Sequence, residues 1–326
     1  MSNVKSNNNF NDQGVATSKG YDLIGDIHGH ADELTALLDL MDYRLMAGCY
    51  RHSERTVIFL GDFIDRGPKQ REVLNIVMPM VKYGKARAVM GNHEFNALAF
   101  HTSDPQNSDS WLRLHTDKNI KQHKAFLDEY SGREHQSELE EVFDFFWSLP
   151  LWIDLDGISV VHACWENRYI NALGNAYLTP NRLVAASTKG TLEYNAIEAL
   201  LKGIEHPLPD GVSFKDKGGH ARTNVRIKWW VNKDSRLGDI TMPSSILDGS
   251  GVENDIISAD QLHGYRKECK PVFIGHYWMN MKDGEPTLLA DNVACIDYSV
   301  AGNGKLVAYR WSGEELLSES NFIYVK

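Results

Sequence analysis

The sequence lacks the features that define disulfide-rich, membrane-spanning and repeat proteins. It has 4 cysteines among 326 residues, and they lie far apart with no CxxC pair. Neither a disulfide framework nor a structural zinc knuckle is therefore indicated. No uninterrupted apolar run approaches the roughly 20 residues that a membrane helix needs, and no segment repeats at a fixed period. With 42% hydrophobic and 24% charged residues, the composition is that of an ordinary globular chain.

Basic residues are also fewer than acidic residues. The chain has 34 Lys and Arg against 44 Asp and Glu, which gives a formal net charge of -10. An acidic surface disfavours nonspecific binding to nucleic acid and to anionic membranes, so we expect neither as a partner. It also repels anionic substrates unless a local feature reverses the sign of the charge.

The domain organisation follows from changes in composition along the chain. Residues 1–19 are polar, Asn- and Ser-rich, and contain no apolar h-region, so we expect a disordered tail instead of a signal peptide, and a cytoplasmic protein. No clean linker divides residues 20–326, which favours a single domain. Within it, residues 100–148 are polar and helical in pattern, as in an insertion. Residues 204–270 have little periodicity and are expected to form a loop-rich region facing the substrate.

The first hundred residues alternate between strand-like and helix-like patterns. The runs YDLIG (21–25), TVIFLG (56–61) and ARAVMG (86–91) are apolar, end in glycine and precede helix-like segments. The first of these segments has leucines and a methionine at helical spacing, and Pro68 is expected in the first turn of the second. Repeated strand, loop and helix indicate an α/β fold, with further strand-like runs after Pro150.

Polar residues gather where five of the strand-like runs end. The first three clusters are GDIHG (25–29), GDFIDRG (61–67) and GNHE (91–94), and two later runs end in His162 and His276. Ligands collect at the carboxyl ends of strands in open α/β sheets, so these segments can converge on one crevice. Carboxylate, imidazole and amide oxygen suit Mn, Fe, Zn or Co, and they suit Mg less well.

GDIHG, GDFIDRG and GNHE, in this order, resemble the signature blocks of the calcineurin-like metallophosphoesterases, specifically the phosphoprotein phosphatase branch. The resemblance implies a β-sandwich of mixed sheets flanked by helices, here with a helical insertion. It also implies two divalent metal ions, with Mn the best fit and Fe, Zn, Co, Ni and Mg as alternatives. The residues implied are Asp26 and His28 for the first metal, Asp62 as the bridge, and Asn92, His162 and His276 for the second. In such a site, a hydroxide held between the metals attacks phosphorus in line.

The same resemblance implies residues for proton transfer and for substrate binding. His93 matches the general acid that protonates the leaving oxygen, and Asp65 matches the carboxylate that orients His93. Arg66 can present a bidentate fork to phosphate oxygens. A second phosphate-binding arginine is expected from a later loop, and Arg222 and Arg226 are both candidates. The remaining histidines are expected on the surface or in packing: His30, His52, His101, His115, His123, His135, His206, His220 and His263.

The substrate is less well defined than the chemistry. Asp65 and Glu94 resemble residues of serine/threonine protein phosphatases, which favours phosphoserine and phosphothreonine monoesters. The later segments FIGHYW and CIDYSVAGNGKLVAYRW resemble symmetrical diadenosine tetraphosphatases, so hydrolysis of dinucleoside polyphosphates is the alternative. A noncatalytic phosphate-binding module is a third hypothesis, although such a module has no need of His93. The expected partner is a phosphorylated protein or a small phosphorylated molecule, and the oligomeric state stays open.

Overall fold

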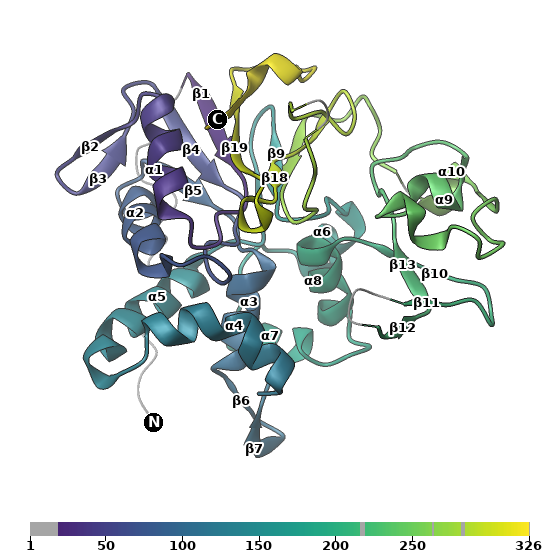
Figure 1. Cartoon of the computed structure of the whole chain (residues 1–326), viewed down its shortest axis with the longest axis horizontal. Helices are drawn as coiled ribbons and strands as arrows, with labels where there is room; N and C mark the ends of the chain where they lie inside the picture. The colour runs from purple at the N-terminus through teal and green to yellow at the C-terminus, as the bar shows by residue number, and fades with distance from the viewer. Residues whose placement is uncertain (1–18, 216–218, 263, 282–283, 326) are drawn as a thin grey trace.

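A computed structural model describes residues 19–215, 219–262, 264–281 and 284–325 (Figure 1). The tail predicted over residues 1–19 lies outside this range except for Lys19. Within the described ranges, no helix combines the length and the apolar character needed to cross a membrane. The division into a tail and a single domain stays a prediction.

The first sheet has six strands and contains the three strands predicted near the start of the chain. Three of its strands run parallel, and the remaining ones are added through an antiparallel neighbour. The parallel strands are β1 (Gly20–Ile24), β4 (Arg55–Phe59) and β5 (Ala86–Ala88), and the others are β18 (Asp297–Tyr298), β19 (Lys305–Trp311) and β20 (Phe322–Tyr324).

The second sheet has four strands, all from the later half of the strand-like runs. Its neighbours run parallel except at one edge, where β8 is antiparallel to β9. The strands are β8 (Trp152–Asp154), β9 (Ser159–Val161), β16 (Val272–Ile274) and β17 (Val293–Cys295).

The two sheets pack face to face. Successive side chains of a strand point to opposite faces, and β4 shows this clearly. Ile58 joins a buried cluster that also contains Val160 and Phe273 of the second sheet, whereas Val57 and Phe59 join the cluster under the helices. The chain therefore forms the predicted α/β sandwich of mixed sheets.

Helices cover the outer faces of the sandwich. The predicted helix after β1 is α1, which buries Leu34, Leu37 and Leu38. The next helix begins at Gln70, so Pro68 precedes the helix instead of lying in its first turn, which corrects the prediction. The helices outside the insertion are α1 (Ala31–Leu40), α2 (Gln70–Lys82), α3 (Asn92–Phe100), α6 (Asn167–Leu173), α7 (Pro180–Ala186) and α8 (Leu192–Lys202), and a hairpin of β2 (Arg44–Met46) and β3 (Cys49–Arg51) lies between α1 and β4.

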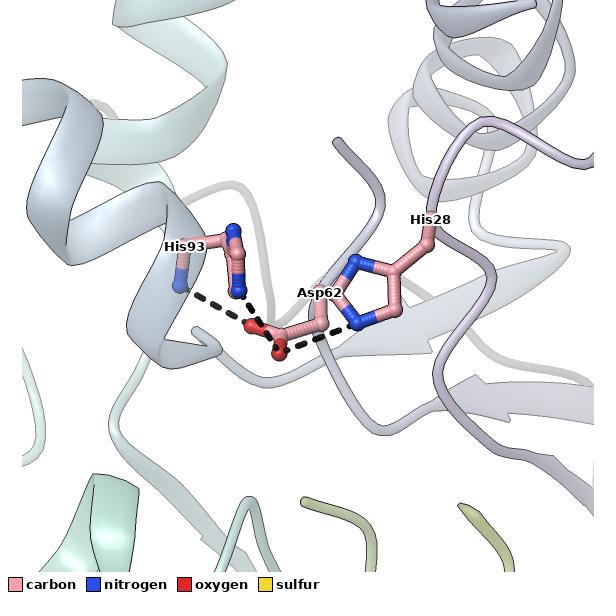
Figure 2. Close-up of side chains that lie close together, drawn as sticks. All are labelled: His28, Asp62 and His93. Atoms are coloured by element: carbon pink, nitrogen blue, oxygen red, sulfur yellow. Dashed lines mark hydrogen bonds and ion pairs between the residues drawn. The ribbon is translucent and has the colours of Figure 1, made fainter. Parts of the chain in front are cut away.

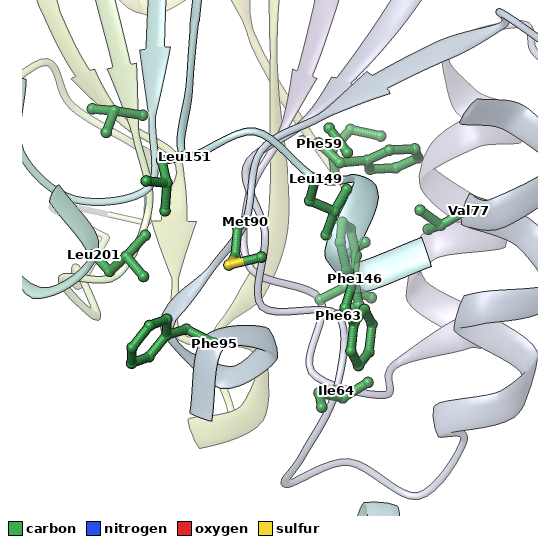
Figure 3. Packing of buried hydrophobic residues seen from close by; sticks show 14 of the residues in the cluster. Phe59, Phe63, Ile64, Val77, Met90, Phe95, Phe146, Leu149, Leu151 and Leu201 are labelled. Carbon is green, nitrogen blue, oxygen red and sulfur yellow. The ribbon is translucent and has the colours of Figure 1, made fainter. Parts of the chain in front are cut away.

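The insertion over residues 100–148 contains a hairpin as well as helices. Its elements are β6 (Ser103–Asp104), β7 (Asn107–Trp111), α4 (Asp117–Glu129), a 3₁₀ turn (Arg133–His135) and α5 (Gln136–Ser148). Phe146 of α5, together with Leu149, packs near Phe59 and Phe63 (Figure 3). The insertion is thus anchored to the core of the first sheet and brings α4 beside α3 (Figure 1).

The region over residues 204–270 has a small apolar core of its own, which the sequence pattern did not reveal. Leu208, Val225, Leu237 and Ile257 are among the residues of this cluster. The elements are short: β10 (Glu205–Pro207), β11 (Phe214–Lys215), β12 (Ala221–Arg222), β13 (Asn224–Arg226), β14 (Ser235–Arg236), α9 (Leu237–Ile240), a 3₁₀ turn (Ser244–Leu247), β15 (Ile256–Ile257) and α10 (Ala259–Leu262). Two further 3₁₀ turns lie outside this region, at Val300–Gly302 and Glu319–Asn321.

Candidate active site

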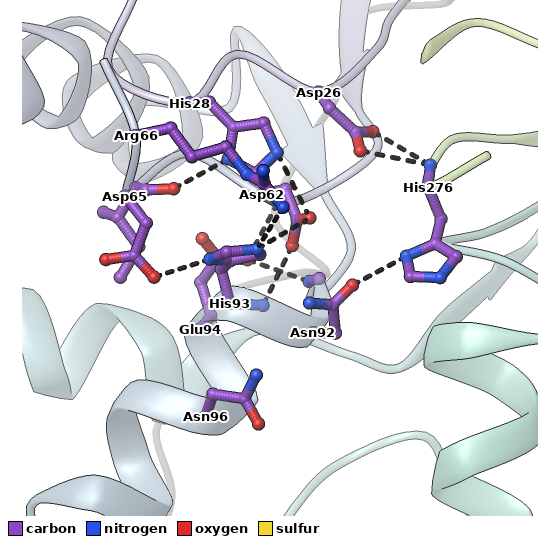
Figure 4. Close-up of polar contacts among 12 residues, drawn as sticks. Asp26, His28, Asp62, Asp65, Arg66, Asn92, His93, Glu94, Asn96 and His276 are labelled. Atoms are coloured by element: carbon purple, nitrogen blue, oxygen red, sulfur yellow. Dashed lines mark hydrogen bonds and ion pairs between the residues drawn. The ribbon is translucent and has the colours of Figure 1, made fainter. Parts of the chain in front are cut away.

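Loops at the carboxyl ends of strands from both sheets meet around one carboxylate (Figure 4). The first sheet contributes the loops after β1 and β4 and the start of α3, and the second sheet contributes the residues after β9 and β16. The side chains brought there are Asp26, His28, Asp62, Asn92, His93, His162 and His276. The structure therefore gathers the predicted metal-binding residues at one place, although their roles stay predictions.

Asp62 lies at the centre of this group (Figure 2). The distances from its Oδ2 to the Nε2 atoms of His162, His28 and His93 are 3.4, 3.6 and 3.9 Å. Its Oδ1 accepts a hydrogen bond of 2.9 Å from the backbone N–H of His93. Two sets of potential ligand atoms share this carboxylate, one with His28 and His93 and the other with His162 and His276.

Backbone carbonyls orient two of the imidazoles. His28 Nδ1 donates to Ile64 O at 2.9 Å, and His162 Nδ1 donates to Leu60 O at 2.7 Å. Because His28 Nδ1 holds the proton of this ring, His28 Nε2 presents a lone pair toward Asp62. Among the described residues, His28 Nε2 and His276 Nε2 have no hydrogen-bond partner although both are buried. The His28 nitrogen faces the carboxylate of Asp62 at 3.6 Å, and such a pair is a donor set that a divalent cation would bind.

Asn92 and Asp26 make their hydrogen bonds with the histidines of the second sheet. The Oδ1 atom of Asn92 lies 2.7 Å from His276 Nδ1 and 3.2 Å from His162 Nε2. The carboxylate of Asp26 accepts from the backbone N–H of His276 at 3.1 and 3.3 Å. Asp26 belongs to neither set of ligand atoms that converge on Asp62, so its placement differs from that of His28.

The site contains an excess of buried carboxylates, which shifts the pKa values of its residues. Burial raises the pKa of Asp26 well above its ordinary value, and the nearby carboxylates of Asp297 and Asp62 raise it further. Burial alone would lower the pKa of His162, but Asp62 and Asp26 outweigh it and raise that pKa to about 10. Three buried carboxylates thus create a demand for positive charge. Divalent cations would meet that demand, and the residues present fit them.

Glu94 is hydrogen-bonded to the backbone of the loop after β4 and of the segment before α3. Its carboxylate accepts from the backbone N–H groups of Asp62 and Phe63 at 2.8 Å each and of Gly91 at 3.0 Å. The side chain is fully buried. Its carboxylate therefore serves the backbone of these loops, and the substrate type inferred from the resemblance at Glu94 stays a prediction.

The backbone around the site is unusually constrained. His28, Asp62 and His276 have φ angles of 47°, 51° and 71°, in the left-handed region that non-glycine residues rarely adopt. At Gly91 the reason for glycine is a close approach, since a Cβ atom there would lie 2.2 Å from Asp62 Oδ1. The ligand loops are therefore fixed by local geometry as well as by side chains.

Asp65 lies between two imidazoles. Its Oδ2 is 2.5 Å from His93 Nδ1, and its Oδ1 is 2.8 Å from His123 Nδ1. Burial would raise the pKa of Asp65, but hydrogen bonds from His123 and His93 lower it to about 2. In turn, burial would lower the pKa of His93, and Asp62 and Asp65 raise it. The expectation that His123 is a surface or packing residue was therefore wrong, because α4 brings its ring to this carboxylate.

The candidate arginines occupy different surroundings. The Arg66 guanidinium lies over the Trp278 ring at 4.2 Å, and its Nη2 is 3.5 Å from His93 Nε2. Arg222 is exposed and pairs with Glu205 at 3.7 Å. Arg226 Nε is buried and has no hydrogen-bond partner in the described part of the chain, and the Arg226 charge contributes to the lowered pKa of His276. The geometry thus separates two arginines that the sequence could not distinguish.

The chain belongs to the calcineurin-like phosphoesterase family, whose model matches residues 21–200, more than half of the sequence. This family comprises metal-dependent hydrolases that act on phosphorylated substrates.

Two relatives and one solved structure illustrate the similarity. Bis(5'-nucleosyl)-tetraphosphatase PrpE [asymmetrical] from Bacillus subtilis (strain 168) is 33% identical over 133 residues, which are 40% of this chain and 51% of that protein. The symmetrical bis(5'-nucleosyl)-tetraphosphatase from Psychromonas ingrahamii (strain DSM 17664 / CCUG 51855 / 37) is 31% identical over 105 residues, 32% of this chain and 31% of that protein. The chain thus spans about half, or less, of the length of these curated relatives. A protein serine/threonine phosphatase from Saccharomyces cerevisiae with similarity to human phosphatase PP5 aligns with a TM-score of 0.49 and 15% identity, covering 94% of this chain and 78% of that one.

Proposed function

We propose that this protein hydrolyses phosphate esters or phosphoanhydrides at the site around Asp62. The observation that carries the proposal is the pair of His/Asp ligand sets sharing one buried carboxylate, beside an imidazole held by a second carboxylate. A noncatalytic binding module would require the first arrangement but not the second. Membership of a family of hydrolases agrees with this choice.

The residues proposed to hold two divalent cations are Asp26, His28, Asp62, Asn92, His162 and His276. Bound there, the cations would supply Lewis-acid charge for the phosphoryl oxygens and would activate a water molecule as the nucleophile. Manganese is the metal we propose to test first, because imidazole, carboxylate and amide ligands together suit it.

His93 is proposed to donate a proton to the leaving oxygen. Asp65 supports this role because a carboxylate at 2.5 Å from Nδ1 stabilises the protonated ring and fixes its orientation. His123 acts as a positioning residue for Asp65. Arg66, beside His93 Nε2, and Arg226, beside His276, are proposed to bind the nonbridging phosphate oxygens.

Two substrate classes follow from different observations. The names of the curated relatives favour a dinucleoside polyphosphate. Phosphoserine and phosphothreonine esters are the second candidate, because an alkoxide leaving group depends most strongly on a proton donor such as His93. The carboxylate of Glu94 serves the loop backbone, so we place the polyphosphate first.

The class of reaction is tested by turnover of nitrophenyl phosphate with and without added metal. We expect hydrolysis with Mn, Ni, Co or Fe and none after chelation. Asp62→Asn should abolish turnover, whereas Asp128→Asn, the same change on the exposed face of α4, should leave it intact. Absence of turnover of both nitrophenyl phosphate and diadenosine tetraphosphate with every metal would refute the proposal. Comparison of kcat/KM for diadenosine tetraphosphate and a phosphothreonine peptide then distinguishes the two substrate classes.

A further inference from the structure

A second cavity, of about 300 Å³, lies beside His93 and is built largely by the insertion. It shares Asn92, His93 and Asp65 with the site around Asp62, and the remaining lining residues are not part of the proposed metal site. Those that matter most are Arg66, Asn96, Arg113, Lys118, Gln122 and Lys202. They come from the loop after β4, from α3, from the segment after β7, from α4 and from the end of α8.

The lining concentrates positive charge in an otherwise acidic protein. It includes the four cations Arg66, Arg113, Lys118 and Lys202, while the whole chain has a formal charge of -10. Asp65 is the only carboxylate that the described part of the chain places in the lining, and His93 and His123 occupy both of its oxygens. Cationic walls without accessible carboxylates attract anions.

Among the described residues Arg113 has no direct acidic partner, although the carboxylates of Asp65 and Glu198 act on its charge from a greater distance. Its Nη1 donates to Asn96 Oδ1 and its Nη2 to Gln122 Oε1, both at 2.8 Å. These acceptors are neutral amide oxygens, so they orient the guanidinium without cancelling its charge. The residue is partly buried, and a partly buried guanidinium without a counterion is stabilised when an anion binds. Lys202 differs, because it pairs with Glu198.

The position of the cavity indicates which part of the substrate it would receive. His93 lines both the metal site and the cavity. A group that takes a proton from His93 therefore leaves toward Arg113 and Lys118. The charges are suited to a leaving group that is itself an anion.

We propose that this cavity is a subsite for the phosphate groups of the leaving half of a polyphosphate substrate. The inference rests on the proposed function and deepens it. In the step concerned, water gives up one proton to solvent, its oxygen forms a bond to phosphorus, and the bond from phosphorus to the bridging oxygen breaks. The electron pair of that bond goes to the bridging oxygen, which takes the proton of His93. The remaining phosphates of the leaving group contact Arg113 and Lys118.

The test compares two substrates that differ in the charge of the leaving group. Diadenosine tetraphosphate has a polyphosphate leaving group, and nitrophenyl phosphate has none. We expect Lys118→Gln to lower the ratio of the two kcat/KM values about five- to tenfold and Arg113→Gln to lower it about ten- to a hundredfold, the range for hydrogen bonds to charged groups. Lys121→Gln, an exposed lysine on the same helix that does not line the cavity, is the matched control and should leave both substrates unaffected.

The outcomes separate the two proposals. If the unmodified protein hydrolyses neither substrate with any metal, the proposed function fails. If it hydrolyses both and the ratio is unchanged in Lys118→Gln and Arg113→Gln, the subsite is refuted while the proposed function stands. Loss of activity on a phosphothreonine peptide as large as the loss on the tetraphosphate also refutes a polyphosphate subsite. Lys118 is exposed, so its variant stays informative even if Arg113→Gln proves unstable in a melting measurement.

Discussion

Replacing Asp65 by asparagine removes a single charge from between two imidazoles without changing the shape of the side chain. Both carboxylate oxygens accept, at 2.5 Å from His93 Nδ1 and 2.8 Å from His123 Nδ1. Asparagine keeps one acceptor and turns the other into a donor. The protonated form of His93 therefore loses its charged partner.

The expected size of this effect follows from the contact that is lost. A hydrogen bond to a charged group contributes about 1.5–3 kcal/mol. At about 1.4 kcal/mol for each factor of ten in rate, kcat should fall roughly 10- to 100-fold for alkyl phosphates. Nitrophenolate leaves readily without a proton, so its kcat should fall much less.

The assay is a series of aryl and alkyl phosphates with leaving groups of increasing pKa. We expect the rate of the Asp65→Asn variant to depend more steeply on that pKa than the rate of the unmodified protein. Asp128→Asn on the surface of α4 is the control. An equal loss of rate for every leaving group would contradict the reasoning, because it would mean that Asp65 acts on the fold or on the metals instead of on His93.

The Asp65→Asn variant also tests the charge interaction of Asp65 with His93 and His123 through the free energy of unfolding. The pKa of Asp65 is lowered from 3.8 to about 2, a difference equivalent to about 2 kcal/mol. Since a lowered carboxyl pKa stabilises the fold through the ionised form, this contribution is complete above pH 4 and disappears as the pH falls through 2. Urea unfolding should therefore show the variant less stable at pH 7 and the difference shrinking between pH 4 and 2.

Three further changes give separate expectations. His123→Phe keeps the aromatic stacking within α4 but removes a hydrogen-bond donor to Asp65. The kcat on alkyl phosphates should therefore fall roughly tenfold, the loss of about one hydrogen bond. The control is His115→Phe at an exposed histidine, and an equal fall in kcat for both variants would contradict the role of His123 in positioning Asp65. Gly91→Ala places a methyl group against the carboxylate of Asp62, so manganese binding by calorimetry should be lost, and normal binding would show that the loop adapts. Arg226→Gln should raise KM for every phosphate substrate, whereas Arg222→Gln should leave it unchanged, and the reverse result would invert our assignment.

Residues close to strand ends were the most predictable part of this molecule. Asp26, His28 and Asp62 follow buried strands within a few residues, so the α/β pattern alone places them at the same edge of a sheet. The mixed sandwich itself was correctly predicted, because the strand-like runs are short and apolar and the family resemblance supplies their arrangement.

Residues that act across long sequence separations were not predictable. His123 is 58 positions from Asp65, and the packing of α4 against α2, with ring contacts to α3 and α5, brings the two together. Arg113 depends on the same packing. Glu94 was predicted beside the chemistry and lies there, but the sequence did not show that its carboxylate accepts from backbone N–H groups of two loops. For His123 and Glu94 the deciding factor is a hydrogen bond to a distant segment, which local spacing does not encode.

The division of the ligands between the two sheets has a mechanical consequence. His162 and His276 extend from the second sheet, while Asp62 extends from the first. Apolar side chains fill the space between the sheets, and a few hydrogen bonds beside the site, such as that from His162 to Leu60 O, also join them. Cations held by His162, His276 and Asp62 would act as a cross-link between the halves of the sandwich. Binding of metal should then slow amide hydrogen exchange in β9, β16 and β4 together. The metal-bound protein should unfold as one unit, and the metal-free protein should unfold one sheet at a time.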